Sequence, residues 1–319
     1  MLPEKAKTGF FSSKEDPMPK SLRKGKTVFI LAMIALAMFN FILFYVVVNI
    51  NSILLALKEF VGYSETGDVI YKFSLGNFVR LWNDITDPEV SVIGPALINT
   101  LIFFVMQTFI LLPLCFFISY FLYKKVFGYK VFRFVFFLPN IISSVVLVAM
   151  FQNLIAVNGP IAAIMRHFGG KMPSLLTDER TAKWVILAYC MWTGFGVNVV
   201  LYQGAMSRIP ESTIEAGKLD GVGMWREMVS IIIPMMWPTL STTIILAMTG
   251  IFTASGPMLL FTQGKFDTMT ISYWIFDQVN FSNSYEYPSA IGLTFTLLGL
   301  PIVLGCRRLM NRVYEDVEY

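Results

Sequence analysis

Residues 96–123 read ALINTLIFFVMQTFILLPLCFFISYFLY, a stretch of 28 residues without a single Asp, Glu, Lys, Arg or His. The hydrocarbon core of a membrane is about 30 Å thick, and a helix needs about 20 apolar residues to cross it. The stretch is long enough for that crossing and too poor in charge for the surface of a soluble protein. It therefore predicts a membrane-spanning helix.

The whole chain has the same character. Of its 319 residues, 55% are hydrophobic and 14% are charged, whereas a water-soluble domain carries about 25% charged residues. This composition excludes the soluble globular, collagen-like, disordered and disulfide-scaffold classes. Runs of about 17–25 apolar residues predict an all-α integral membrane protein with six transmembrane helices. The predicted spans are residues 28–50, 96–123, 134–157, 184–202, 239–261 and 290–306.

Six spans place both ends of the chain on the same side of the membrane. The two tails and the second and fourth loops contain 17 Lys and Arg residues, and the first, third and fifth loops contain 8. Because cytoplasmic loops carry an excess of Lys and Arg, both termini are predicted to be cytoplasmic. The third loop, residues 158–183, is locally net positive and argues against this orientation, but the other six segments agree with it.

The predicted spans contain no charged residue, and the single histidine, His167, lies in an outer loop. Proton- and ion-coupled transporters need such residues at membrane depth. A membrane hydrolase needs a base beside its nucleophile, or a bound metal, and an ATPase needs a G-x-x-x-x-G-K-S/T loop; the sequence has neither pattern. We therefore expect a non-catalytic chain with no metal site and no cofactor of its own. Energy for uphill transport would come from another polypeptide.

The loop between the fourth and fifth predicted spans, residues 209–234, has the pattern of two short helices. Pro210 and Glu211 suit the first turn of a helix. Asp220-Gly221 is a dipeptide that ends helices and makes turns. These signals predict a first helix of about ten residues.

A second helix is predicted from Met224 to Pro234. It is expected to present four apolar side chains broadly on one side: Met224, Trp225, Met228 and Val229. Two short helices that meet at a glycine elbow have too little core to form a domain and too much apolar surface to remain bare. The loop is therefore expected to dock into a groove of a partner protein.

The spacing within this loop is specific. Residues 215–217 read Glu-Ala-Gly, Gly221 follows after three residues, and nine more separate it from Ile231, which precedes Ile233-Pro234. The stretch resembles the EAA motif of the membrane subunits of binding-protein-dependent ABC importers. The pattern of that motif is Glu-Ala-Ala, three residues, Gly, nine residues, Ile, one residue and Leu-Pro.

Two positions depart from the motif. Gly217 replaces an Ala and would loosen the first helix by ~1 kcal/mol, and Ile233 replaces a Leu. The Asp220-Gly221 pair resembles in particular the carbohydrate-importing branch, the maltose and glycerol-phosphate permease type. The resemblance extends over residues 75–310, through short stretches near the ends of other spans: residues 73–78, Asn99-Thr100, Phe132-Arg133, Leu138-Pro139, residues 261–264 and residues 287–290.

This resemblance implies the fold of a type I ABC importer permease. The implied parts are a basic cytoplasmic tail at residues 1–27, a six-span permease domain at residues 28–310 that includes the coupling loop at residues 209–234, and a cytoplasmic tail at residues 311–319. The location would be the plasma membrane of a bacterium, where the basic tail suits contact with anionic lipid.

The resemblance also implies a function, which is to form half of the translocation path for a sugar or oligosaccharide. The implied partners are a second, non-identical permease subunit, a cytoplasmic ATPase dimer that uses ATP and Mg, and an extracytoplasmic solute-binding protein. No nucleic-acid partner is expected. A six-span secondary transporter or channel is the alternative from a different class.

Coupling to the ATPase is assigned by the resemblance to seven residues: Glu215, Ala216, Gly217, Asp220, Gly221, Met224 and Trp225. Gly221 would form the elbow and Trp225 an anchor, while the loop moves as a rigid lever when the two ATPases close. The alternative for Glu215 is an ordinary solvated carboxylate on a helix.

Polar residues within the spans are candidates for the solute path. Hydroxyl and amide groups bind sugar hydroxyls, aromatic faces stack on sugar rings, and uncharged groups suit a neutral solute. The resemblance places solute contacts on the spans that flank the loop, where the candidates are Tyr189, Trp192, Thr193, Asn198, Thr249, Thr253 and Ser255. The alternative for each polar residue is helix packing, because Ser, Thr and Asn also join helices in membranes.

Overall fold

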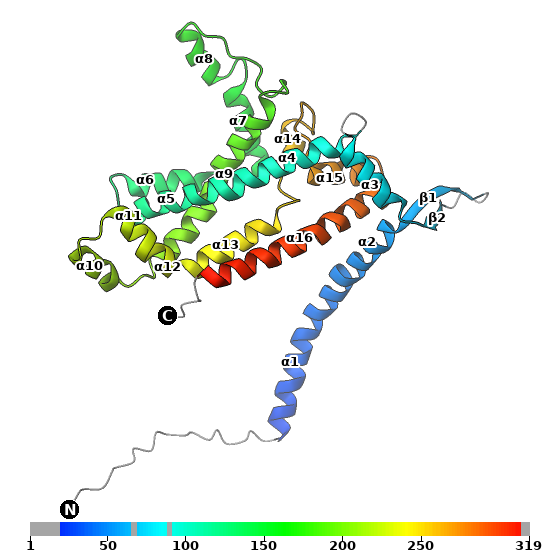
Figure 1. Cartoon of the computed structure of the whole chain (residues 1–319), viewed down its shortest axis with the longest axis horizontal. Helices are drawn as coiled ribbons and strands as arrows, with labels where there is room; N and C mark the ends of the chain where they lie inside the picture. The colour runs from blue at the N-terminus through cyan, green and yellow to red at the C-terminus, as the bar shows by residue number, and fades with distance from the viewer. Residues whose placement is uncertain (1–19, 65–68, 88–90, 314–319) are drawn as a thin grey trace, which may run out of the picture. The chain divides into compact units, whose positions relative to one another are not determined.

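Figure 1 shows the computed structural model of the chain, which describes residues 20–64, 69–87 and 91–313. The chain divides into two units, Met1–Leu54 and Leu55–Tyr319, and each is described by itself. Of the two predicted tails, residues 1–19 and 314–319 lie outside the described residues.

The first unit contains the N-terminal helix. It consists of α1 (Lys20–Phe41), the π-helical turn η1 (Ile42–Val47) and most of α2 (Val48–Ala56). Its apolar stretch, Gly25–Ala56, has 32 residues and is long enough to cross a membrane. The helix begins at Lys20, within the predicted tail, because residues 20–27 contain no proline and only one glycine to interrupt it.

The second unit opens with a β-hairpin that the sequence did not predict. Strand β1 (Lys58–Tyr63) pairs antiparallel with β2 (Val69–Phe73). The short helix α3 (Gly76–Thr86) follows the hairpin. The side-chain amide of Asn77 donates to the backbone oxygen of Lys58 at 2.7 Å and so holds α3 against the hairpin.

The second predicted span is one long helix. It is built from α4 (Ile93–Val105), the π-helical turn η2 (Met106–Leu111) and α5 (Leu112–Tyr123). Its 31 residues include the whole predicted range, 96–123.

The third predicted span, residues 134–157, is wrong at its N-terminal end. This region forms α6 (Tyr129–Phe137), the 3₁₀ turn η3 (Leu138–Asn140), α7 (Ser144–Ile155) and α8 (Pro160–His167). Pro139 cannot donate the backbone hydrogen bond that would continue α6, and residues 141–143 are not helical. The apolar helical stretch long enough to cross a membrane is Ser144–His167.

The rest of the second unit is helical around one irregular segment. The elements are α9 (Ala182–Met206), α10 (Glu211–Leu219), α11 (Met224–Glu227), η4 (Met228–Ile232), α12 (Ile233–Met235), α13 (Trp237–Thr249), α14 (Met258–Phe261), α15 (Ile271–Phe281) and α16 (Glu286–Val313). α9 and α16 contain the fourth and sixth predicted spans. The fifth predicted span, residues 239–261, is wrong beyond Thr249, because residues 250–257 do not form a helix.

The number of spans agrees with the prediction when one bent pair is counted as a single span. Five helices among the described residues are long and apolar enough to cross a membrane. The sixth would be Met224–Met235 together with Trp237–Thr249, two pieces bent by 77°. Pro234 and Pro238 flank this bend and remove two backbone donors there.

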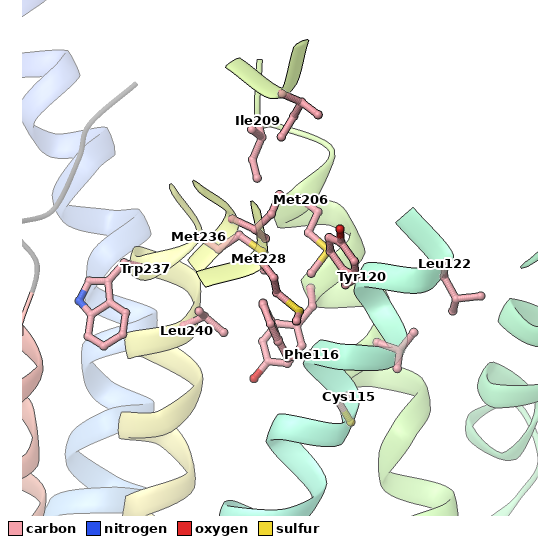
Figure 2. Close-up of a cluster of buried hydrophobic side chains, with 14 of the residues drawn as sticks. Cys115, Phe116, Tyr120, Leu122, Met206, Ile209, Met228, Met236, Trp237 and Leu240 are labelled. Atoms are coloured by element: carbon pink, nitrogen blue, oxygen red, sulfur yellow. The ribbon is translucent and has the colours of Figure 1, made fainter. Parts of the chain in front are cut away.

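The largest cluster of buried apolar side chains lies beneath the loop between α9 and α13 (Figure 2). α5 contributes Phe116 and Tyr120, and Met206 from α9 and Met228 from the loop pack in the same cluster. Met228 is 2% exposed, so the prediction that it lies on the same side as Trp225 is wrong. The second helix of the loop is apolar on two faces, and its sequence pattern alone did not show which face is buried.

Candidate functional site: a coupling loop and a polar cavity

The loop at residues 209–234 has the predicted glycine elbow. At the end of α10 the N–H of Val222 donates to the carbonyl oxygen of Gly217 at 2.9 Å, and the N–H of Gly221 donates to that of Lys218 at 3.1 Å. Gly221 has a φ of +71°, a left-handed conformation that costs roughly 1–2 kcal/mol for a residue with a Cβ. Gly221 therefore ends α10 and reverses the chain toward α11.

The elbow presents apolar side chains to its surroundings. The exposed apolar residues are Leu219 (88% exposed), Met224 (41%), Trp225 (63%) and Val229 (57%). Six of the seven predicted coupling residues are exposed on the loop: Glu215, Ala216, Asp220, Gly221, Met224 and Trp225. Exposed apolar surface with a polar rim is typical of a protein–protein contact.

Gly217, the seventh coupling residue, is buried where the two helices of the loop meet. A Cβ atom at this position would lie 2.7 Å from Cδ1 of Ile231. The sequence predicted only that this glycine loosens α10. The structure gives it a second effect, because its lack of a side chain lets α10 pack directly on η4.

An ion pair with a buried carboxylate connects the second half of the loop to the end of α5. The carboxylate of Glu227, a residue that is 6% exposed, pairs with the ammonium group of Lys124 just after the end of α5. The ring of Trp225 also packs edge-on against Phe117 of α5, with ring centroids 6.0 Å apart. The sequence did not identify Glu227 or Lys124, because they lie far apart in the chain and no local pattern links them.

Most of the predicted path residues line a cavity within the second unit. The cavity has a volume of about 760 Å³, and its walls come from α4, η2, α5, α9, α13 and the irregular segment 250–257. Five of the seven predicted path residues line it: Thr193, Asn198, Thr249, Thr253 and Ser255. Among the described residues that line this cavity, none carries a charge.

One stripe of α9 forms a wall of the cavity. The stripe consists of Cys190, Thr193, Gly194, Val197, Asn198 and Leu201. These positions recur at intervals of three and four residues, which is the spacing of one helix face. With 3.6 residues per turn, Trp192 falls on the other side of α9.

Tyr189 and Trp192 pack away from the cavity in an aromatic cluster. The ring centroid of Tyr189 lies 5.2 Å from that of Phe151 in α7 and 5.0 Å from that of Phe261 in α14. Trp192 stacks on Phe151 with centroids 6.3 Å apart. Both side chains thus contribute to helix packing, and the role in sugar stacking stays a prediction.

Hydrogen bonds orient the polar groups of the cavity. The side-chain amide of Asn198 donates to the backbone oxygen of Gly194 at 2.9 Å, and that of Gln107 donates to the backbone oxygen of Ser255 at 3.3 Å. Thr249 donates its hydroxyl proton to the backbone oxygen of Leu246 at 2.6 Å. The side-chain oxygens of Asn198, Gln107 and Thr249 can still accept hydrogen bonds. These acceptors suit a ligand that carries hydroxyl groups.

Three polar residues of the cavity wall lie outside the seven path residues predicted from the sequence: Gln107, Thr108 and Thr243. Thr108 lies in η2, and Thr243 lies in α13, where its hydroxyl is 3.1 Å from that of Tyr202. A π-helical turn changes which residues share a face and is frequent at functional sites. The α-helical period therefore does not predict that Thr108 faces the cavity. For Thr108 and Thr243, the only signal in the sequence is a polar residue within an apolar span.

A polar network joins α4 to the N-terminal end of α9. The coupling loop follows the opposite end of α9. Nζ of Lys183 donates to Oδ1 of Asn99 at 2.8 Å and pairs with the carboxylate of Asp267 at 2.7 Å. The amide nitrogen of Asn99 donates to the backbone oxygen of Met269 at 2.9 Å. Asn99 is 1% exposed, so it connects two helices with the segment that follows α14.

A family profile matches most of the second unit. The family is described as "Binding-protein-dependent transport system inner membrane component", and the match covers residues 111–315, which is more than half of the chain. The matched residues include the coupling loop and the α9 and α13 walls of the cavity.

Curated relatives carry the names of sugar permeases. The lactose transport system permease protein of Rhizobium radiobacter is 30% identical over 72% of this chain and 78% of that protein. The multiple sugar-binding transport system permease protein of Streptococcus mutans is 26% identical over 56% of this chain and 63% of its own length. The maltose/maltodextrin permease protein of Vibrio vulnificus is 25% identical over 65% of this chain, but the match spans only 39% of that protein.

Solved structures share the fold. A chain of a bacterial ABC transporter involved in the import of the acidic polysaccharide alginate aligns with a TM-score of 0.76 and 18% identity, over 92% of this chain and 99% of that chain. These comparisons do not favour a secondary transporter or a channel. Family profile, lactose relative and fold agree, and the chain therefore belongs to the binding-protein-dependent transport system inner membrane components, the multi-pass permease subunits of ABC importers.

Proposed function

We propose that the chain forms half of the translocation path of an ATP-driven importer for a neutral sugar or oligosaccharide. The observation that carries this proposal is the cavity of about 760 Å³, whose described lining residues are polar or apolar but uncharged. An unpaired charge at mid-membrane costs ~2.5–3.5 kcal/mol, and a neutral sugar avoids that cost. Relatives named for lactose, maltose and alpha-glucosides support a sugar as the solute.

The path needs a second permease subunit. This chain would form one half of the path, and a second, non-identical subunit would form the other half. An extracytoplasmic solute-binding protein would deliver the sugar, in keeping with the family description. In this proposal the chain lies in the plasma membrane of a bacterium, with both termini in the cytoplasm.

Energy would reach the path through the coupling loop. The exposed side chains of Leu219, Met224 and Trp225 would sit in a cleft of a cytoplasmic ATPase subunit, and ATP and Mg would bind to that partner. A lever of this kind has to be stiff. The turn at Gly221, the packing of Gly217 on Ile231 and the buried carboxylate of Glu227 all support such stiffness.

The test is transport by the complete importer in proteoliposomes. The chain would be purified with its partner subunits and its binding protein, and uptake of labelled lactose, maltose and maltotriose would be compared with uptake of the acidic trisaccharide trigalacturonate. We expect at least one neutral sugar to be taken up only when the ATPase side has ATP, and collapse of ion gradients to leave that uptake unchanged. Uptake driven by an ion gradient, or of trigalacturonate alone, would refute the proposal.

A further inference from the structure

A second cavity lies beside the coupling loop. It has a volume of about 710 Å³ and is bounded by the end of α5, by α6, by the last turns of α9 and by α10. It shares no lining residue with the polar cavity described above. The proposed solute path therefore gives it no role.

The charge of this second cavity is positive. Its basic lining residues are Lys124, Lys125, Arg133 and Lys218, and its acidic lining residue is Glu211. Lys124 is neutralised by Glu227. Within the part of the chain that the structure describes, no ion pair engages the other three basic side chains. With Glu211 as the acidic residue of the lining, the wall keeps a net positive charge, and this charge suits a phosphate group.

The backbone at Lys125 adds to this picture. Lys125 has a φ of +55°, a left-handed conformation that is uncommon for residues other than glycine. This conformation ends α5, because the N–H of Lys125 donates to the carbonyl oxygen of Leu122 and the N–H of Val126 donates to that of Phe121. The helix end places the Lys125 side chain in the lining of the cavity.

Hydrogen-bond acceptors line the same cavity. Gln203 is 7% exposed, and its side-chain oxygen has no hydrogen-bond partner among the described residues. A buried acceptor of this kind is costly unless something donates to it. The carboxylate of Glu211 is a second acceptor in the wall. A ligand with hydroxyl groups as well as a phosphate would satisfy both kinds of lining group.

We propose that this cavity binds the phosphate ester of a polyol. The phosphate pairs with Lys125, Arg133 and Lys218, and the hydroxyl groups donate to Gln203 and Glu211. The same chemistry occurs in the headgroup of phosphatidylglycerol and in soluble glycerol phosphate.

The surroundings of the cavity suit a lipid. Next to it, α6 and the turn before it expose Phe127 (101% exposed), Val131 (65%) and Phe134 (60%), along which acyl chains can lie. A bound ligand would connect α6 with the first helix of the coupling loop. Binding of this ligand does not depend on the proposed transport function. An experiment that refutes one of the two proposals therefore leaves the other standing.

The first experiment measures lipid retention by the purified importer. The complex in phosphatidylcholine nanodiscs is supplied with phosphatidylglycerol, and bound lipid is counted by native mass spectrometry. Lys125→Gln with Arg133→Gln should reduce retention by about fivefold for each charge removed. Lys130→Gln removes the same charge from α6 outside the cavity and should leave retention unchanged. The same loss per charge removed in the pair and in the control would show general surface attraction and overturn the site.

The second experiment separates the hydroxyl groups from the charge. Phosphatidylethanol has the same phosphate charge as phosphatidylglycerol but no headgroup hydroxyl, so the wild-type importer should retain it about fivefold less well. Gln203→Leu should reduce this preference, because only Glu211 then accepts from the hydroxyl groups, and it should still bind phosphatidylethanol. A wild-type importer without the preference would overturn the assignment of Gln203 and Glu211.

A third arm decides between the two sources of the ligand. Soluble glycerol 1-phosphate is titrated into the importer in phosphatidylcholine nanodiscs, and heat of binding is recorded. Saturable binding that Lys125→Gln with Arg133→Gln abolishes, without retention of phosphatidylglycerol, would identify a soluble phosphate as the ligand. Retention of the lipid alone would identify the headgroup. Binding of neither compound would refute the proposal.

Discussion

Gly221 and Gly223 lie two positions apart in the coupling loop and differ in backbone conformation. Gly221 has a φ of +71°, whereas Gly223 has an extended backbone with a φ of −72°. A Cβ atom would meet no other atom within 4 Å at either position. The pair therefore separates the effect of a left-handed backbone from the effect of packing.

Gly221→Ala is expected to destabilise the end of α10 by roughly 1–2 kcal/mol, because alanine is disfavoured in the left-handed region. Hydrogen exchange of the α10 amides should become faster by about tenfold or more. Gly223→Ala is the matched control and should leave exchange unchanged. Equal acceleration in both variants would show that α10 does not depend on the conformation of Gly221.

Within the polar cavity, Asn198 offers a direct test of sugar contact. Asn198→Ala is expected to raise the apparent KM for the neutral sugar by about tenfold, which corresponds to one lost hydrogen bond. Asn280 in α15 makes the same kind of bond to the preceding helical turn, at 2.8 Å, but lies outside the cavity. Uptake by Asn280→Ala should match the wild type. An unchanged KM in Asn198→Ala would remove Asn198 from the path.

At the scale of elements, α5 is the physical connection between the coupling loop and the cavity. Glu227 pairs with Lys124 just after α5, and Trp225 packs on Phe117 in the middle of α5. Leu112, at the other end of α5, lines the cavity. Motion of α11 can therefore reach the cavity wall through one continuous helix. Helices that are packed in this way can move together as a rigid body and so transmit a displacement from one site to another.

Loss of the buried carboxylate should weaken this connection. Breaking a fully buried pair costs ~3–5 kcal/mol, and the side chain of Lys124 is 27% exposed, so Glu227→Gln is expected to lower the free energy of unfolding by about 1–3 kcal/mol. Glu215→Gln changes an exposed carboxylate of the same loop and should have little effect. Thermal unfolding of the purified complex measures both. Exchange of the two charges, Lys124→Glu with Glu227→Lys, should recover part of the loss.

At the scale of the whole molecule, the charge distribution predicts which side each loop faces. In a background where the three native cysteines are replaced, Ser64→Cys and Ser282→Cys should react with an impermeant maleimide added to intact cells. Ser212→Cys should react only after the membrane is opened. Labelling at position 212 in sealed cells would reverse the orientation.

Much of the fold could be predicted, because every helix that spans a membrane needs an apolar stretch of sufficient length, and this stretch is visible in the sequence. The predicted spans are wrong where an apolar stretch is not helical. Pro139 ends α6, and residues 250–257 continue from α13 as irregular backbone. Irregular backbone is tolerated at membrane depth where it lines a cavity. Residues 253–257 line the polar cavity. Apolar composition alone does not distinguish this case from a helix.

The candidate site was predicted where it depends on local spacing. The elbow at Gly221 follows from the spacing of the loop, and five path residues meet at one cavity. The ion pair between Lys124 and Glu227 depends on a contact between distant parts of the chain. The indole of Trp192 suits sugar stacking by its chemistry, but packing between helices decides which side of α9 faces the cavity.

We expect the loop at residues 209–234 to couple ATP hydrolysis in a partner to the path in this chain. The most direct measurement is the ATPase rate of the importer in liposomes, with and without binding protein loaded with sugar. If the loop is the lever, Glu215→Ala with Gly221→Pro should leave insertion and assembly intact and abolish the stimulation. Full stimulation in the assembled variant would contradict it.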